Sequence, residues 1–470
     1  MLSRLILCLS KCSRGVIIGK KYTAAGSNCE VESPDSWTKD NRSRGVLRLT
    51  RDGLTLQQMT VARTSVIAAN VMHTCALLKD GTASCWGKNS GGQLGDGTTD
   101  DRTAPVPVKG LGNAVAITAG GAHTCALLKD GTVRCWGANP HGELGDGTTT
   151  TRGTAIAVSG ISNAAAIAAG DNYSCALLKD GTVRCWGSNL FGQLGDGTRE
   201  DRVTSVPVKS VHKAVAIATG DIHACAIRKD GIARCWGENI DGQLGDGTTK
   251  RRLTPSAVAN LSNAVAIEAA SSHTCALNKS GAVHCWGDNA AGQLGDGTVS
   301  KFQLAATAVT GLANIVAIAA GGLDTCAVFK EGTVSWWGGY AGQHGDSTFE
   351  RRFSPVRVAR LANVAAIAVG AGHACALLSD RTVSCWGNFG QGVIKTREMN
   401  QPIVIKGVTD IMDIASGVGH TCAPREGWFC ILLGTKRLGT AWRWHDLQPK
   451  LARPRAGCNR RSGHHCRGHA

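Results

Sequence analysis

The stretch His123–Gly137, which reads HTCALLKDGTVRCWG, decides the fold because the chain repeats it at a regular interval. Five copies start 50 residues apart, at His73, His123, Tyr173, His223 and His273. Later copies are less regular and place their first cysteines at Cys326, Cys375 and Cys422, after steps of 51, 49 and 47 residues. Seven copies carry the tryptophan of the stretch: Trp86, Trp136, Trp186, Trp236, Trp286, Trp337 and Trp386. Self-similarity at a fixed period of this length indicates a repeat architecture.

Each repeat contains the patterns of four short strands. An apolar run, Ala114–Ile117 in the clearest copy, is followed by Cys125–Leu128 and Val133–Trp136. Lys129-Asp130-Gly131 joins these last two segments and is typical of a tight hairpin with a left-handed glycine. A fourth strand, seen at Val106-Pro107-Val108, carries a proline that only an edge strand tolerates. Four strands per repeat and seven repeats predict an all-β fold, a seven-bladed β-propeller with irregular N- and C-terminal tails.

The two ends of the chain lack the repeat. Residues 1–60 are expected to form a leader or linker that begins with a weak, truncated signal-like run at residues 5–9, interrupted by Lys11 and Arg14. Residues 61–422 are expected to form the propeller. An eighth unit opens with His420-Thr421-Cys422 and then stops, so a strand over residues 413–418 is expected to close the seventh blade. Residues 423–470 form a basic, irregular tail, hypothesised to be out of frame, which resequencing of the coding region would test. No stretch reaches the roughly 20 apolar residues of a membrane span.

The formal charge of +16 is concentrated in these ends. Residues 1–60 contribute +5 and residues 423–470 contribute +8, which leaves +3 for the repeats. A nucleic-acid site calls for basic residues clustered on a folded face. The charge distribution therefore argues against nucleic acid as a partner.

The repeat resembles the regulator of chromosome condensation repeat. The residues that carry the resemblance are the His-Thr-Cys-Ala-Leu-Leu-x-Asp-Gly-Thr-Val-x-Cys-Trp-Gly unit and the Gly-Gln-Leu-Gly-Asp-Gly-Thr segment that follows it, over residues 61–422. The unit is most similar to a bacterial, cysteine-bearing branch, which includes a propeller-type β-lactamase inhibitor. The resemblance implies a seven-bladed propeller that works as a protein-interaction platform. The sixth and seventh units depart from it, with Trp336 in place of the second cysteine and Gly390–Val393 in place of Leu-Gly-Asp-Gly.

The cysteines are expected to meet in pairs. The hairpin register places Cys125 directly across from Cys135 in a non-hydrogen-bonded pair, where two Cα atoms lie close enough for a disulfide. The same pairing is expected for Cys75/Cys85, Cys175/Cys185, Cys225/Cys235, Cys275/Cys285 and Cys375/Cys385. Oxidised pairs would favour a secreted or periplasmic protein, and buried thiols a cytoplasmic one.

Two motifs could suggest ligand chemistry. His123, Cys125 and Cys135 could bind zinc, but Tyr173 and Asp324 replace the histidine in other copies, which favours a structural histidine. Gly145-Asp146-Gly147 lacks the lysine of a phosphate-binding loop and is better explained as a turn closed by its carboxylate. No catalytic constellation stands out. The chain is therefore expected to be no enzyme and to bind no metal or cofactor.

Recognition is expected at the positions that differ among the repeats, because repeated residues build the scaffold. One variable loop follows the tryptophan, a second follows the Gly-Asp-Gly turn, and a short third one precedes the first hairpin strand. The candidate partner-binding residues are His141, Leu190, Phe191, Ile240, Asp241 and Tyr340. The sequence thus predicts a monomeric scaffold that binds an unknown protein partner. Guanine-nucleotide exchange on a small GTPase and inhibition of a secreted enzyme such as a β-lactamase are the alternatives.

Overall fold

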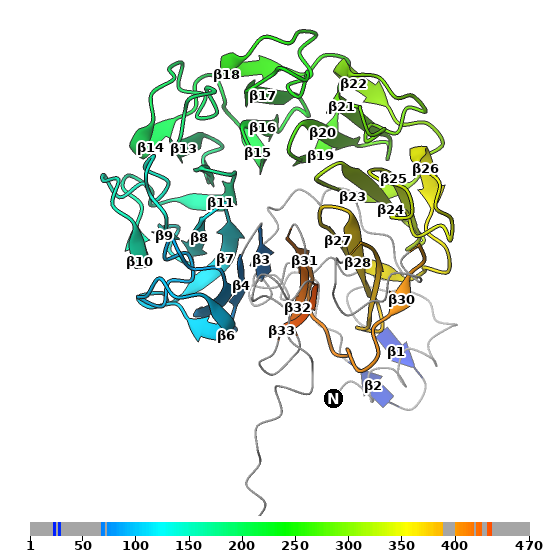
Figure 1. The fold of residues 1–470 in the computed structure, drawn as a ribbon, viewed down its shortest axis with the longest axis horizontal. Coiled ribbons are helices and arrows are strands. Elements are labelled where there is room, and N and C mark those ends of the chain that lie inside the picture. Colours follow the sequence, from blue (N-terminus) through cyan, green and yellow to red (C-terminus); the bar gives the residue numbers. More distant parts are fainter. Residues whose placement is uncertain are drawn as a thin grey trace, which may run out of the picture. The chain divides into compact units, whose positions relative to one another are not determined.

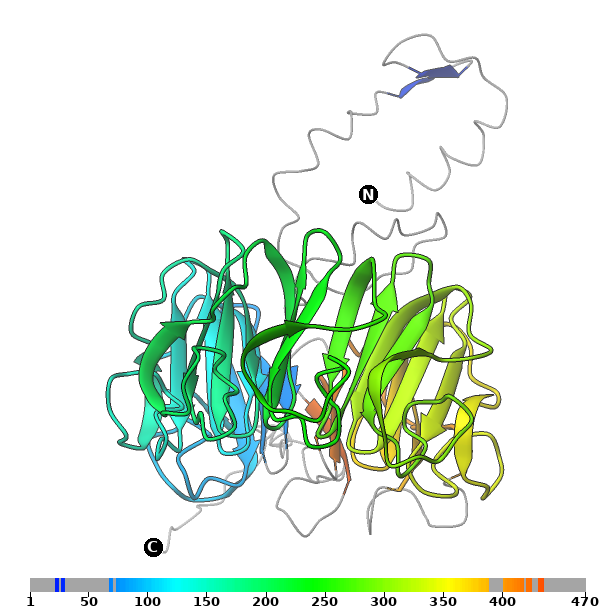
Figure 2. The same ribbon diagram turned by 90° about the horizontal axis from the view of Figure 1, so that it is seen from above.

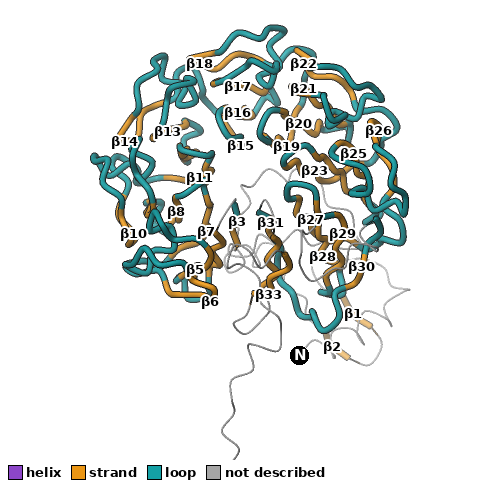
Figure 3. The backbone as a smooth tube through the Cα atoms, viewed as in Figure 1, coloured by secondary structure: helices purple, strands orange, loops and turns teal. Residues whose placement is uncertain are grey.

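The computed structural model describes residues 22–24, 27–29, 67–70, 73–388, 400–417, 420–424 and 430–434, and every regular element in these ranges is a β-strand (Figure 3). Two compact units divide the chain after Val46. In residues 1–46 the described element is a hairpin of β1 (Tyr22–Ala24) and β2 (Ser27–Cys29). The signal-like run at residues 5–9 and most of the 423–470 tail lie outside the described residues.

Residues 47–470 contain seven four-stranded antiparallel sheets, the blades, which follow one another along the chain (Figure 1). The first three consist of β3 (Ile67–Ala69), β4 (His73–Leu77), β5 (Ala83–Gly87) and β6 (Arg102–Pro107); β7 (Ala114–Ala119), β8 (His123–Leu128), β9 (Val133–Gly137) and β10 (Arg152–Ala157); and β11 (Ala164–Ala169), β12 (Tyr173–Leu178), β13 (Val183–Gly187) and β14 (Arg202–Pro207). The next two consist of β15 (Ala214–Thr219), β16 (His223–Arg228), β17 (Ala233–Gly237) and β18 (Arg252–Ala257); and β19 (Ala264–Ala269), β20 (His273–Asn278), β21 (Val283–Asp288) and β22 (Phe302–Ala308). The last two consist of β23 (Ile315–Gly321), β24 (Asp324–Phe329), β25 (Val334–Gly338) and β26 (Arg352–Arg357); and β27 (Val364–Val369), β28 (His373–Leu378), β29 (Val383–Gly387) and β30 (Ile403–Val404). The predicted seven-bladed propeller with four-stranded blades is confirmed.

A three-stranded sheet completes the ring between the seventh blade and the first. It consists of β31 (Ala415–Ser416), β32 (His420–Pro424) and β33 (Cys430–Gly434), and β31 packs against both β27 and β3 (Figure 1). The expectation that residues 413–418 close the seventh blade is wrong, because β30 supplies that blade's fourth strand and β31 begins the further sheet. His420 Nε2 lies 2.7 Å from Thr74 Oγ1 of the first blade, so side chains as well as strands join the two ends of the ring.

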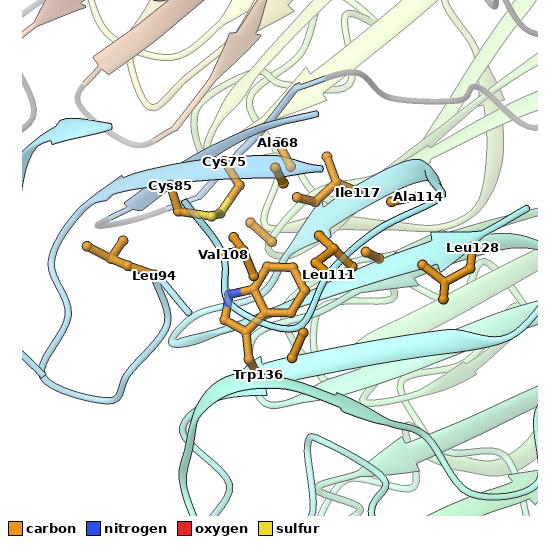
Figure 4. Packing of buried hydrophobic residues seen from close by; sticks show 14 residues of the cluster. Ala68, Cys75, Cys85, Leu94, Val108, Leu111, Ala114, Ile117, Leu128 and Trp136 are labelled. Atoms are coloured by element: carbon orange, nitrogen blue, oxygen red, sulfur yellow. A yellow bond between two sulfur atoms is a disulfide. The ribbon is translucent and has the colours of Figure 1, made fainter. Parts of the chain in front are cut away.

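In the first five blades the connection after the tryptophan strand packs a leucine between neighbouring blades. Leu94 from the first blade's connection is fully buried beside Val108, which follows β6, and Trp136 of the second blade (Figure 4). The Trp136 indole N–H donates to the backbone carbonyl of Gln93 over 2.9 Å. Four more tryptophans make the equivalent bond at 2.8–3.0 Å, namely Trp186 to Glu143, Trp236 to Gln193, Trp286 to Gln243 and Trp337 to Gln293. Because a buried donor without an acceptor is costly, each bond ties one blade to the next.

The histidine that opens six of the repeats makes a second hydrogen bond between neighbouring blades. His123 Nε2 lies 2.8 Å from Ser174 Oγ in the next blade. The Thr124 hydroxyl donates to the Gln93 carbonyl, so it is free to accept the proton of His73 Nε2, 2.8 Å away. The same contact recurs for His223, His273 and His373 with Thr274, Thr325 and Thr421 at 2.9–3.0 Å. The histidines are therefore structural side chains, as the sequence favoured.

We call the contact between two neighbouring blades a seam. The seams after the third and the sixth blade lack this histidine, and in both of them the residue of the next blade that would face it differs as well. Tyr173 replaces the histidine in the third blade, and the next blade carries Ala224 where the hydroxyl should be. The Tyr173 hydroxyl donates to the backbone carbonyls of Gly220 and His223 instead. Asp324 replaces the histidine in the sixth blade and accepts a hydrogen bond from Trp336 Nε1 over 3.2 Å, and the next blade carries Ala374. Among the described seams, the serine or threonine is therefore present only where the preceding blade carries the histidine.

We expect the ring to lose stability in mild acid. Burial lowers the pKa of His73, His223 and His373 to about 3 and that of His123, His273 and His420 to about 4. The unfolded chain, with a histidine pKa near 6.5, therefore binds protons that the folded chain does not. Stability is complete above pH 6.5 and falls as the pH drops below it, by about 2 kcal/mol per histidine at pH 5.

Denaturant unfolding followed by tryptophan fluorescence at pH 7.5, 6 and 5 measures this loss. A midpoint that stays constant from pH 7.5 to pH 5 would contradict it.

Candidate functional site

All three variable segments lie on one face of the propeller. In the third blade Tyr173 pairs with Gly187 and Gly187 pairs with Arg202, so the start of β12, the end of β13 and the start of β14 lie at the same end of the sheet. The short segment before β12 and the long connection from β13 to β14 must therefore emerge on the same side. Figure 2 shows the strands running between two faces of the propeller. The Lys-Asp-Gly turns join the second strand of a blade to the third at the other end of the sheet, so they lie on the face opposite the variable loops.

The two longer variable loops are parts of one connection. In the third blade this connection spans residues 188–201 and is fixed at its centre by Asn189. The Asn189 side chain accepts from Leu194 N at 3.1 Å and donates to Asp196 Oδ1 at 3.1 Å. Asp196 Oδ1 also accepts from Thr198 N at 2.9 Å, so the aspartate between the glycines closes a turn, as the sequence indicated. The centre is rigid, and the residues on either side of it can vary.

The carboxylate of this turn is held ionised by its neighbours. In the first blade burial alone would raise the pKa of Asp96, but hydrogen bonds from Thr98 and from the Arg102 guanidinium lower it to about 2. The Arg102 contact is 2.8 Å, and Arg152, Arg202, Arg252 and Arg352 repeat it in other blades. The charged carboxylate of the Gly-Asp-Gly turn is thus engaged in contacts that stabilise the connection.

Three of the predicted partner-binding residues project into solvent. Leu190, Ile240 and Tyr340 follow the tryptophan strands of the third, fourth and sixth blades, and their exposed fractions are 54%, 65% and 63%. Their exposure is unusual for large apolar side chains, and none of them belongs to a hydrophobic core cluster of the described residues. Exposed apolar groups gathered on one face are typical of a protein-binding surface.

The other three predicted residues contact neighbouring groups. The exposed His141 imidazole lies 2.8 Å from Asp201 of the next blade. The half-buried Phe191 ring lies beneath the guanidinium of Arg251, with 5.0 Å from its centroid to Cζ. Burial, together with the charge of Asp288, raises the pKa of the half-buried Asp241. His141 and Phe191 therefore help to join consecutive blades.

Two more exposed apolar residues lie on this face. Val299 follows the Gly-Asp-Gly turn of the fifth blade and Phe349 follows the equivalent Gly-Asp-Ser turn of the sixth, and their exposed fractions are 51% and 63%. Phe349 belongs to a variable loop recognised in the sequence, but its exposure could not be inferred from the repeat pattern. Its ring lies against Gly342, two residues from Tyr340.

The cysteines form the six predicted pairs. Cys125 and Cys135 are directly opposite in the register, with their Cα atoms 4.1 Å apart and a disulfide between them. The other five are Cys75–Cys85, Cys175–Cys185, Cys225–Cys235, Cys275–Cys285 and Cys375–Cys385. In the sixth blade Trp336 stands opposite Cys326, as the sequence indicated. Within the described ranges no group of three or more histidine, cysteine or acidic side chains is placed to hold a metal ion.

The described part of the chain has no helix of the length and apolar character that crossing a bilayer requires.

Comparison with known proteins agrees with the architecture. A family model described as the RCC1-like domain matches residues 38–338, and one described as the regulator of chromosome condensation (RCC1) repeat matches residues 364–392. No curated protein matches the chain in sequence.

Three solved structures share the fold. Prp20p from Saccharomyces cerevisiae, in a study of its binding to Gsp1p and histones, is 22% identical over 79% of this chain and 94% of its own, with a TM-score of 0.61. The yeast RCC1 (Prp20) bound to Kap60 is 20% identical over 85% of this chain and 95% of its own, with a TM-score of 0.62. Human WBSCR16 is 19% identical over 73% of this chain and 99% of its own, with a TM-score of 0.60. The family-model match, which spans more than half of the chain, shows that this protein belongs to the RCC1-like domain family.

Proposed function

We propose that the chain is a non-enzymatic scaffold that binds a protein partner through its variable-loop face. The observation that carries the proposal is the exposure of Leu190, Ile240 and Tyr340 at matching loop tips of three blades. The hydrogen bonds of each connection hold these tips on a rigid frame, which lowers the entropic cost of ordering them on binding. The structurally similar Prp20p is described by its binding to proteins, Gsp1p and histones.

Guanine-nucleotide exchange and inhibition of a secreted enzyme were expected as alternatives, but no contact among the described residues favours either. Because the β-sheet ring is joined end to end within one chain, through Thr74 and His420, we propose that the protein acts as a monomer. The bacterial branch within the family remains a prediction.

We propose an oxidising compartment, because six cysteine pairs lie at disulfide distance. Alkylation of the unfolded protein without reductant, followed by peptide mass spectrometry, is expected to leave the twelve paired cysteines unmodified and joined as Cys-x9-Cys peptides. Full alkylation of these cysteines in protein isolated from its native source, with thiols trapped at lysis, would contradict the proposal.

The partner-binding face is tested by two isoleucines of the fourth blade. Ile240 is 65% exposed on the variable-loop face and Ile232 is 39% exposed on the opposite face. We expect Ile240→Ser combined with Tyr340→Ser to weaken partner capture at least about tenfold, since removing an apolar side chain from the centre of an interface costs about 1–2 kcal/mol. Ile232→Ser should leave capture unchanged.

The measurement is quantitative affinity capture from the native source, with the bound partner identified by mass spectrometry and its affinity then measured by calorimetry. Phe191 is left intact because its contact with Arg251 supports the fold. Equal capture by the Ile240/Tyr340 variant and the wild type, or loss of capture with Ile232→Ser alone, would refute a binding site on the variable-loop face.

A further inference from the structure

One residue position carries information about the chemistry of the partner. It lies at the end of the variable connection, directly before the fourth strand in most blades. In the first four blades and the sixth it holds Asp101, Thr151, Asp201, Arg251 and Arg351. In the fifth blade, whose fourth strand begins one residue earlier in the register, it holds Phe302, and Lys301 directly precedes it. No basic residue occupies this position or the one before it in the first three blades, whereas at least one does in each of the next three.

The local fold does not dictate this sign. In the first blade Lys88 at the start of the connection pairs with Asp101 at its end over 2.7 Å. In the fourth blade the same two positions carry the reverse pair, Glu238 and Arg251, at 2.6 Å. In both blades the carboxylate also accepts from the backbone N–H of the asparagine that recurs in each repeat, Asn89 or Asn239, at 2.9 Å. Since either arrangement satisfies the connection, folding alone does not account for the switch of sign at its end.

The basic residues of the fourth to sixth blades are held over aromatic rings. Arg251 lies 5.0 Å from the centroid of Phe191, Lys301 lies 5.4 Å from that of Phe302, and Arg351 lies 5.2 Å from that of Phe353. A cation above a ring face is attracted to it and keeps its charge. In the fifth and sixth blades an exposed positive charge is thus positioned by a ring, whereas in the fourth blade Arg251 is also paired with Glu238 and Lys250 is the exposed charge.

Exposed apolar side chains lie among these charges. They are Ile240, Val299, Tyr340 and Phe349, with exposed fractions of 51–65%. Consecutive connections touch, because Gly242 lies against Gln303 and Leu304 at the start of β22, and Gly292 lies against Phe353 at the start of β26. The residues thus form one continuous rim, which we call the cationic sector: Ile240, Lys250, Arg251, Val299, Lys301, Tyr340, Phe349 and Arg351.

The acidic residues of the same connections are mostly less accessible. Glu238 is paired with Arg251, and Asp246 and Asp346 are paired with Arg252 and Arg352. Asp241 and Asp288 are half-buried, and Glu350 is exposed. The charges that reach solvent in this sector are therefore mainly positive, namely Lys250, Lys301 and Arg351. In the first and third blades the exposed residues at the end of the connection are acidic, namely Asp100, Asp101, Glu200 and Asp201, which pair with Arg102, Lys88, Arg202 and His141.

We propose that the cationic sector binds an acidic protein segment that also carries apolar side chains. The carboxylates of the segment would meet Lys250, Lys301 and Arg351, and its apolar side chains would cover Ile240 and Tyr340. This inference rests on the proposed function and adds the chemistry of the partner to it. The charge of the sector is what complements an acidic segment, and its exposed apolar side chains are what a purely polar polyanion would leave uncovered.

The test uses the full chain and three fluorescent probes in anisotropy titrations. The first is a short peptide in which glutamate alternates with leucine and phenylalanine, the second has lysine in place of glutamate, and the third is oligo-thymidine. The variant Lys250→Glu/Lys301→Glu/Arg351→Glu reverses the three exposed charges. The matched control Lys129→Glu/Lys179→Glu/Lys279→Glu reverses three exposed lysines on the opposite face.

The acidic peptide should bind the wild type and the control variant equally, and the charge-reversed variant should bind it at least about tenfold more weakly. The same variant should gain affinity for the lysine peptide. The Ile240→Ser/Tyr340→Ser variant should weaken both interactions, because its apolar cover is gone.

Four results would overturn the inference. They are failure of the acidic peptide to bind, equal binding by the charge-reversed variant, tighter binding of oligo-thymidine than of the acidic peptide, and self-association of the wild type that charge reversal abolishes. The last two would assign the sector to nucleic acid or to a second copy of the chain. If natural-partner capture still depends on Ile240 and Tyr340, the protein-binding function survives and only the acidic chemistry falls.

Discussion

Each blade of this propeller depends on its neighbours for hydrogen-bond partners of some of its buried polar groups. The Trp136 indole N–H and the His123 imidazole are fully buried, and their partners, Gln93 and Ser174, belong to the preceding and the following blade. A blade folded alone would leave these groups without partners in an apolar setting, at a cost of about 1–3 kcal/mol for each. The ring is therefore stabilised at the contacts between blades, and the His420–Thr74 contact joins its two ends. The repeated residues are constrained by this requirement.

The same constraint leaves other positions open to recognition. The variable connections are fixed by hydrogen bonds such as that between Asn189 and Asp196. A side chain at a loop tip, such as the exposed Ile240, takes no part in the contacts between blades, so its identity is free to vary. A rigid frame with variable tips is the usual arrangement in scaffolds that present loops to a partner. Charge can vary in the same way. The pairs Lys88–Asp101 and Glu238–Arg251 both join the start of the connection to its end, but they place charges of opposite sign at that end.

Much of the fold could be predicted because it depends on local patterns. The Lys129-Asp130-Gly131 turn fixed the hairpin register, and with it the opposition of Cys125 and Cys135. What depends on contacts between blades could not be read from one repeat. Phe191 stays a predicted partner-binding residue, but its contact with Arg251 of the next blade could not be read from its own repeat. The sheet of β31–β33 was indicated only by an incomplete eighth unit, because its second hairpin strand does not follow the repeat. The replacement of the histidine by Tyr173 and Asp324 was visible in the sequence. That each replacement is accompanied by an alanine in the next blade, Ala224 or Ala374, is explained only by the contact between blades that His123 makes with Ser174.

The seam between the third and fourth blades tests the central claim most directly. Tyr173→His and Ala224→Thr together restore the histidine–hydroxyl pair that six other seams contain, whereas each substitution alone supplies only one partner. A double-mutant cycle on the free energy of unfolding, measured at pH 7.5, should give a favourable coupling of about 1–3 kcal/mol, because the introduced imidazole and hydroxyl can satisfy each other only when both are present. Simple additivity of the two single substitutions would show that the seams are not held by paired polar groups and would contradict the account.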